Sequence, residues 1–358
     1  MHASSLCEAE RSQLVADGFL IVRDAVSLAS VERARKLIDD GLPSGKRRLL
    51  APAKLATHPH VYGLFEESCV SDILRHEIGR YPDVISCQIA VTPAFDQLYG
   101  RPRPHVDGSW SGPIPRDGSE IEKIRGRPKD AVSYFGPYDT NRGSNDGLLW
   151  QNPSHTMSLG SYTALVGIAL NDQVEPGNGQ FGVLKGMHDK VAAAFRVQRE
   201  SGGVIGPEGE GWPRIKVGSE GLPYLNGLPK IVENAMAEEF RADPDDSKWP
   251  WPYLTPVLLQ QGDAVIALHS CPHTATPNSG PNPRMNLYFR IRRWREGNPH
   301  ENTRRLGHGV SDHLDRGYYG QYLDYPLEYD PWKTSTSLLC DHWSDWDGFK
   351  GLAQDASP

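Results

Sequence analysis

The chain has few cysteines and no long apolar runs, and these shortages exclude several classes of protein. Its five cysteines, at positions 7, 69, 87, 271 and 340, are odd in number and show no short spacing, so neither a disulfide framework nor a zinc cluster is indicated. No apolar run approaches the length of a membrane span, and the first residues lack the hydrophobic core of a signal peptide. We therefore expect a reduced, cytoplasmic protein that does not enter a membrane.

An excess of positive charge is also missing. The 358 residues include 38 Lys and Arg against 45 Asp and Glu, which gives a formal net charge of −7. A nucleic-acid-binding protein would show a basic face first, so we expect no nucleic-acid partner. Local basic clusters occur at 46–48 and 290–295, where solvated or ion-paired side chains are the simplest interpretation and docking of an anionic substrate or a coenzyme A phosphate is the alternative.

Aromatic residues make up only 9% of the chain, whereas turn formers are abundant, with 36 Gly and 29 Pro. Many turns favour many short strands, and we find neither an internal repeat nor a low-complexity tract. The length suits one elaborated domain over 1–358. The pattern therefore predicts a mainly β fold with flanking helices.

The local patterns place several elements. Apolar residues at helical spacing from Val31 to Ile38, closed by Gly41, predict a helix on the outside of the fold. Strands are expected over 84–92, 162–170, 264–269 and 285–290, with a turn-rich segment over 277–283 that would let one hairpin carry both His273 and Arg284.

The most informative pattern is His105-Val106-Asp107, followed far downstream by His273. Alternate side chains of a strand point the same way, so His105 and Asp107 would project together. Two imidazoles and one carboxylate can occupy one face of a six-coordinate iron and leave three positions open for a chelating cosubstrate and dioxygen. The pattern predicts a metal-dependent oxygenase.

Chance alone produces such pairs, because 13 His and 45 acidic residues in 358 give about 1.6 copies of His-x-Asp/Glu (13 × 45/358). A second copy lies at His313 and Asp315 and is followed by His342, but no arginine that could hold a carboxylate occurs after His342. The first copy is followed by Arg284, eleven residues after His273, and a guanidinium is the side chain that grips a carboxylate in a fixed fork. We therefore assign the site to the first copy.

The third imidazole has two candidates, His269 and His273. Strand parity does not separate them, because Pro272 lies between them and breaks strand regularity. Cys271 is expected to be a small buried side chain rather than a ligand.

Together these residues resemble the phytanoyl-CoA hydroxylase-like branch of the Fe(II)/2-oxoglutarate dioxygenases. The likeness spans residues 17 to about 295 in the family's order, and the interval of eleven residues to Arg284 favours His273 over His269. It rests on four segments: 17–22 with the helix that follows, His105-Val106-Asp107-Gly108, 178–188 ending in Gly186-Met187-His188, and Gly262-Asp263 through His273 to Arg284.

The resemblance implies a double-stranded β-helix, a jelly-roll or cupin-like core, over about 17–295. It also implies Fe(II), 2-oxoglutarate as cosubstrate and O2, with His105, Asp107 and His273 as metal ligands and Arg284 on the distal carboxylate. Halogenating relatives lack the carboxylate, so Asp107 favours hydroxylation, with desaturation or ring formation as further outcomes of the same chemistry.

The chain departs from the family at Ala275, where a Ser often hydrogen-bonds the cosubstrate. Thr276 or Thr92 could take that role, and Gln88 lies on the same strand face as Thr92. Equally, Gln88 and Thr92 could only satisfy buried backbone groups.

Two long insertions, about 111–160 and 191–255, are expected to be lids that decide a small-molecule substrate. Trp110 and Trp150 are candidate substrate contacts, although packing of the lid would also explain an aromatic at 110. The aromatic-rich extension 296–358 should wrap the core or make a homo-oligomer contact. Two other classes stay open: a Zn- or Mn-dependent hydrolase or isomerase, and a non-catalytic small-molecule-binding protein.

Overall fold

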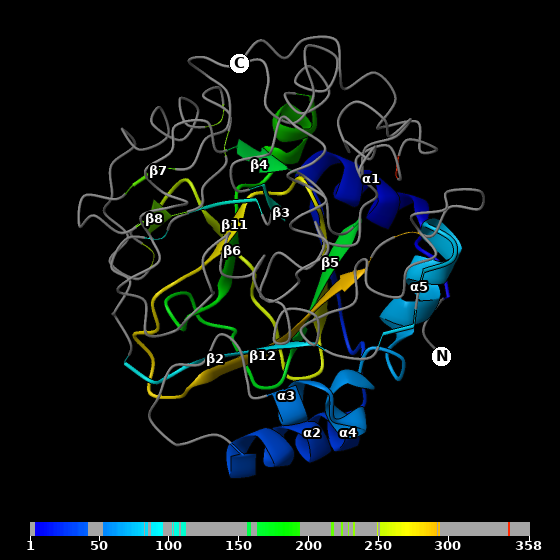
Figure 1. Cartoon of the computed structure of the whole chain (residues 1–358), viewed down its shortest axis with the longest axis vertical. Helices are drawn as coiled ribbons and strands as arrows, with labels where there is room; N and C mark the ends of the chain where they lie inside the picture. The colour runs from blue at the N-terminus through cyan, green and yellow to red at the C-terminus, as the bar shows by residue number, and fades with distance from the viewer. Residues whose placement is uncertain are drawn as a thin grey trace, which may run out of the picture.

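The structure is a computed structural model of the whole chain (Figure 1). The residues described are 4–41, 53–81, 83–84, 87–95, 102, 104–106, 109–111, 156–158, 163–193, 216–217, 223–224, 228, 232, 249, 251–291, 293 and 343. Within them the chain is mainly β-sheet with helices at its N-terminal side. No described helix is long and apolar enough to cross a membrane.

Besides a helical stretch at 188–193, the described helices come early in the chain. They are α1 Glu8–Asp17, α2 Leu28–Gly41, α3 Ala53–Ala56, α4 Pro59–Tyr62 and α5 Cys69–Glu77. The helix expected around Val31 is confirmed as α2, which buries Val31, Ala34 and Ile38, three residues at helical spacing. In Figure 1, α2, α3 and α4 lie below β2 and β12, whereas β6 and β11 lie above them.

The largest sheet has five strands in the order β1-β10-β5-β12-β2, and each neighbouring pair is antiparallel. The central strands are short aliphatic runs that are buried along their whole length, as expected where both faces are covered. Strands β5, β10 and β12 confirm the strands expected near 162–170, 264–269 and 285–290. The bounds are β1 Phe19–Val22, β2 Gln88–Thr92, β5 Ala164–Ala169, β10 Ala264–Leu268 and β12 Arg284–Ile291.

A second sheet, β11-β6-β9, and two strand pairs complete the described β structure. β11 (His273–Ala275) pairs with β6 (Phe181–Val183), which also pairs with β9 (Thr255–Pro256). The strand pairs fall in or beside the two predicted insertions: β3 Ser109–Ser111 with β4 Thr156–Ser158, and β7 Lys216–Val217 with β8 Pro223–Tyr224. Most of 111–160 and 191–255 lies outside the described residues.

β12 has two chemically different faces. Its apolar face contacts the helical side, where the rings of Phe289 and Phe65 lie 5.3 Å apart. Its other face looks toward the second sheet, where the rings of Tyr288 and Phe181 lie 5.7 Å apart. Since side chains alternate along a strand, Arg284 and Asn286 share the face of Tyr288. A polar strand face therefore lies between the two sheets.

The expected hairpin between His273 and Arg284 is wrong. β11 pairs in the second sheet and β12 in the five-stranded sheet, so the chain crosses from one sheet to the other over 276–283. Asn278 fixes this crossing, because its amide donates to the carbonyls of Pro93 (3.0 Å) and Asn282 (2.8 Å). Its side-chain oxygen accepts from the Gly280 N–H, 3.0 Å away. Turn residues thus close a sheet-to-sheet connection rather than a hairpin.

Candidate functional site

His105 and His273 come together across two antiparallel chain segments. The N–H of each residue donates to the carbonyl of the other, at 2.9 Å and 2.8 Å, and the two ring centroids are 5.0 Å apart. Residues directly opposite each other in an antiparallel pair project to the same side. His269, in contrast, directly follows the last residue of β10 in the five-stranded sheet, and its N–H bonds the Thr163 carbonyl at 3.3 Å. The pairing therefore favours His273 over His269 as the partner of His105.

The protonation of His273 is set by its neighbours. The Nδ1 atom lies 3.0 Å from the Cys271 carbonyl oxygen, which accepts but cannot donate, so Nδ1 carries the proton. In the neutral ring, Nε2 is then the basic nitrogen, the form that a metal ligand needs. The imidazole is 6% exposed and packs on the Phe181 ring at 5.0 Å. Cys271 takes part only through its backbone carbonyl, and burial raises the pKa of its thiol.

Asp107, the third predicted ligand, lies outside the described residues. Within the described ranges, no group of three His, Cys, Asp or Glu side chains could hold a metal ion. Trp150, the second His-x-Asp pair at 313–315 and His155 lie outside those ranges as well. Trp110 forms part of β3 opposite Met157, and its side chain is not described.

Arg284 is a buried cation with an unused donor. Its side chain is 1% exposed, and Nε donates to the Gly179 carbonyl at 2.8 Å. Nη1 is buried and has no hydrogen-bond partner among the described residues. Gly179 has φ +76, and a Cβ there would lie 3.4 Å from the Arg284 Cβ, so glycine lets the backbone turn against the arginine. A buried guanidinium with an unused N–H is stabilised most by an anionic acceptor.

Thr92 lies directly opposite Arg284 in the ladder between β2 and β12. It is fully buried, and within the part of the chain that the structure describes its Oγ1 has no hydrogen-bond partner. Side chains at such opposed positions have Cβ atoms about 5 Å apart on one face of the sheet. Two unused buried donors, one cationic and one neutral, therefore lie side by side.

The other predicted cosubstrate contacts are already engaged. The Thr276 hydroxyl donates to the Gln180 carbonyl at 2.8 Å. The Gln88 side-chain oxygen accepts from Arg290 Nη1 at 2.9 Å. Of the three candidates Thr92, Thr276 and Gln88, Thr92 is thus the one whose side-chain oxygen has no hydrogen-bond partner among the described residues.

Sequence reasoning missed the other polar residues on this face of β12. Asn286 and Tyr288 are buried and hydrogen-bonded to each other, Nδ2 to the phenol oxygen at 3.0 Å. The signal was present in the strict polar–apolar alternation over 284–291, Arg-Met-Asn-Leu-Tyr-Phe-Arg-Ile. Such alternation marks a strand with one polar face, here turned toward the second sheet.

The segment 178–188 docks the N-terminal helix onto β6. The His188 imidazole reaches the Val15 carbonyl at 2.9 Å, and Lys185 forms an ion pair with Asp17 at 3.1 Å. Burial lowers the pKa of His188, so the ring is neutral. Gly18, at φ +81, leaves room for this ring, because a Cβ there would lie 2.5 Å from Nδ1. This histidine has a structural role.

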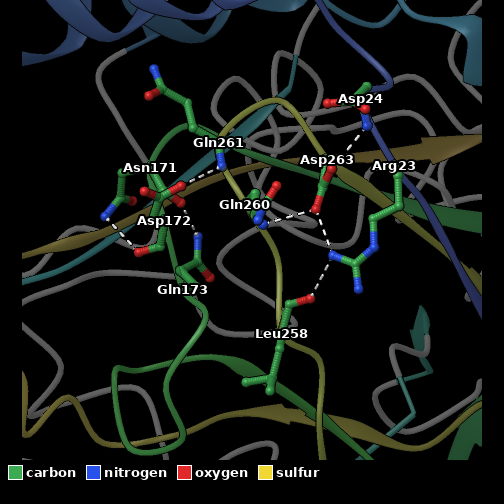
Figure 2. Close-up of polar contacts among 9 residues, drawn as sticks. All are labelled: Arg23, Asp24, Asn171, Asp172, Gln173, Leu258, Gln260, Gln261 and Asp263. Atoms are coloured by element: carbon green, nitrogen blue, oxygen red, sulfur yellow. Dashed lines mark hydrogen bonds and ion pairs between the residues drawn. The ribbon is translucent and has the colours of Figure 1, made fainter.

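Figure 2 shows the polar cluster in which Asp263 joins the start of β10 to the end of β1. Its buried carboxylate accepts from Arg23 Nη1 (2.6 Å), from the Asp24 N–H (2.9 Å) and from the Gln260 N–H (2.8 Å). Gly262, at φ +90, forms the preceding turn. The Gly262-Asp263 pair therefore fixes the strand that leads to His273.

The C-terminal extension touches the core at its one described residue. Trp343 is 2% exposed, and its indole N–H donates to the Thr163 carbonyl at 3.1 Å. At this position the extension packs on the core. Whether the rest of 296–358 wraps the core stays a prediction. An oligomer contact through this segment stays a prediction.

No protein-family model and no curated relative matches the chain. Similar solved structures include HygX from Streptomyces hygroscopicus with nickel and 2-oxoglutarate bound, at 14% identity over 81% of this chain and 90% of that chain, with a TM-score of 0.43. Another HygX structure also contains hygromycin B. SnoK, a non-heme alpha ketoglutarate dependent carbocyclase from nogalamycin biosynthesis, shares 17% identity over 88% and 93% of the two chains, with a TM-score of 0.44.

EctD from S. alaskensis, solved in its apoform, shares 12% identity over 80% of this chain and 78% of that chain, with a TM-score of 0.38. These TM-scores and identities are low, so the function of the chain is inferred from its own side chains.

Proposed function

We propose that the chain is a non-haem Fe(II)/2-oxoglutarate-dependent oxygenase that oxidises an unactivated C–H bond of a small organic substrate, with hydroxylation as the outcome. The observation that carries the proposal is the pair of unused buried donors, Arg284 Nη1 and Thr92 Oγ1, at one register position of β12 and β2. A carboxylate would satisfy both, through a charge-assisted hydrogen bond and a neutral one.

The metal would be held by His105 and His273, whose backbone bridge brings their rings together, and by Asp107 two residues after His105. The residues fit ferrous iron, because imidazole and carboxylate ligands on one side leave open positions. The hydrogen bond that His273 Nδ1–H donates to the Cys271 carbonyl leaves Nε2 as the basic nitrogen. When bound, the iron and the 2-oxo acid supply the dioxygen chemistry that oxidises the substrate and releases succinate and CO2.

The protein's own residues would bind and orient the cosubstrate and would exclude water from the site. Arg284, held by the Gly179 carbonyl, fixes the far end of the cosubstrate, and the aromatic ring of Phe181 packs against the metal-side histidine. Burial of these groups keeps the electrostatic contacts strong. We also propose that the two sheets form a single jelly-roll domain over 1–358, with 111–160 and 191–255 as lids that select a small molecule.

The deciding experiment is anaerobic reconstitution with Fe(II) and 2-oxoglutarate, read as the visible charge-transfer band. His105→Ala and Asp107→Ala should abolish the band and, after oxygen exposure with a metabolite panel, succinate formation. Arg284→Ala should keep the metal and weaken 2-oxoglutarate binding by about a hundredfold, the effect of losing a charged hydrogen-bonded pair. His313→Ala and Asp315→Ala are the matched controls, and a larger effect there would refute the assignment.

A Zn- or Mn-dependent hydrolase or isomerase would turn over without consuming 2-oxoglutarate. A non-catalytic binding protein would bind ligand without forming succinate. Consumption of 2-oxoglutarate that depends on His105 and Asp107 therefore separates the three functions.

A further inference from the structure

A directed chain of hydrogen bonds runs through the polar face of β12. Its first member is the Gln173 amide, whose Nε2 lies close to three oxygens: the Asn171 carbonyl (3.3 Å), the Met285 carbonyl (3.5 Å) and Asn286 Oδ1 (2.6 Å). All three accept, so this atom is the NH2 of Gln173. Figure 2 shows Gln173 beside Asn171, at the edge of the cluster around Asp263.

The orientation of Gln173 fixes the orientation of Asn286. Since Asn286 Oδ1 accepts from Gln173, its Nδ2 is the end that faces the phenol of Tyr288, 3.0 Å away. An amide NH2 only donates, so the Tyr288 oxygen must be the acceptor of this bond. The phenol proton then points away from Asn286.

That proton has no acceptor among the described residues, although Tyr288 is only 8% exposed. A buried hydroxyl normally donates a hydrogen bond, and leaving it unused costs free energy. The chain of amides therefore presents one preset donor to the space between the two sheets.

The position of this donor points to the carboxylate already assigned to Arg284. Tyr288 bonds to Asn286, so its phenol leans back along β12 toward Arg284, one strand repeat of about 6.6 Å beyond Asn286. Asn286 lies opposite Ala90 on one neighbouring strand and Ala169 on the other. Both are small, which leaves room above the amide.

The same ring is tied to the metal side of the site. It packs on Phe181 at 5.7 Å, and Phe181 packs on His273 at 5.0 Å. On its other side, Gly167 gives it space, because a Cβ there would lie 2.8 Å from Tyr288 Cε1. The ring of Phe181 thus links Tyr288 to the proposed metal ligand His273.

We propose that the Tyr288 O–H is a third donor to the distal carboxylate of the 2-oxo acid, together with Arg284 and Thr92, and that Gln173 and Asn286 are positioning residues that aim it. This inference rests on the proposed function. It assigns a binding role to a residue that the sequence motif does not include.

The test is Tyr288→Phe, which removes only the hydroxyl. The Fe(II) protein is titrated anaerobically with 2-oxoglutarate and, separately, with 2-oxobutyrate, which keeps the 2-oxo acid end but has no distal carboxylate. We expect the Kd for 2-oxoglutarate to rise about tenfold or more, as for the loss of one hydrogen bond to a charged acceptor, and the Kd for 2-oxobutyrate to stay unchanged. Tyr81→Phe is the matched control, because that phenol bonds the Ser71 carbonyl among the helices.

The possible results separate the two proposals. If the unmodified protein forms no charge-transfer band with 2-oxoglutarate, the proposed function is wrong. If the band forms but Tyr288→Phe titrates like the unmodified protein, or loses affinity equally for both acids, the role of Tyr288 is wrong and the function stands. An equal loss would mean that the hydroxyl only supports the fold.

Discussion

Replacing Thr92 by valine should stabilise the ligand-free protein and weaken its binding of 2-oxoglutarate. The Thr92 side chain is fully buried, and its hydroxyl has no hydrogen-bond partner in the described ranges. An unsatisfied buried hydroxyl costs about 1 to 3 kcal/mol, and valine has the same branched shape without the polar atom. We therefore expect the free energy of unfolding to rise by about 1 kcal/mol.

The ligand-bound protein should respond in the opposite direction. In the proposed site the hydroxyl donates to the distal carboxylate beside Arg284, its ladder partner. A hydrogen bond to a charged group contributes about 1.5 to 3 kcal/mol, so its loss should raise the Kd for 2-oxoglutarate by about 10- to 100-fold. A residue with a purely structural role would not change stability and affinity in opposite directions.

The two quantities are measured by urea unfolding without ligand and by anaerobic titration of the Fe(II) protein. Thr276→Val is the matched control, because the Thr276 hydroxyl already donates to the Gln180 carbonyl at 2.8 Å. That variant should lose about 1 kcal/mol of stability and keep its affinity. If Thr92→Val instead lost stability and kept its affinity, the anion site opposite Arg284 would be refuted.

Further predictions concern the framework around the site. Gly18→Ala and Gly79→Ala both place a Cβ at φ +81, but only the Cβ at Gly18 would meet another described side chain, that of His188 at 2.5 Å. Gly18→Ala should therefore lower the free energy of unfolding in urea more than Gly79→Ala does, and equal losses would contradict this packing. Because burial lowers the pKa of His188, the unfolded chain binds the proton more readily, so stability should fall as pH drops below about 6.5, and His188→Gln should flatten this slope. Asp263→Asn weakens charge-assisted hydrogen bonds and should lower the free energy of unfolding by about 2 kcal/mol, measured by thermal unfolding. Asp172→Asn, at an exposed carboxylate, should lower it far less, and equal losses would refute the role of the cluster.

The sequence alone was enough to predict several strands, one helix and some of the candidate site residues. Aliphatic runs bounded by turn residues predicted β5 and β10, since burial of a short strand leaves a local pattern, and the segment that follows a turn-rich stretch predicted β12. The same holds for α2, whose apolar residues recur at helical spacing. The spacing of His273 and Arg284 marked both residues as candidates before their surroundings were known.

Only the tertiary structure shows how those residues are placed, and the proposed site rests on that placement. The choice between Thr92 and Thr276 depends on which hydroxyl is already bonded, and the choice between His269 and His273 on which one is bridged to His105. The false hairpin has the same origin, because a turn-rich segment closes a hairpin and a sheet-to-sheet crossing with similar residues. Periodicity reports neighbours along the chain, whereas strand register and hydrogen-bond partners are set by segments far apart in sequence.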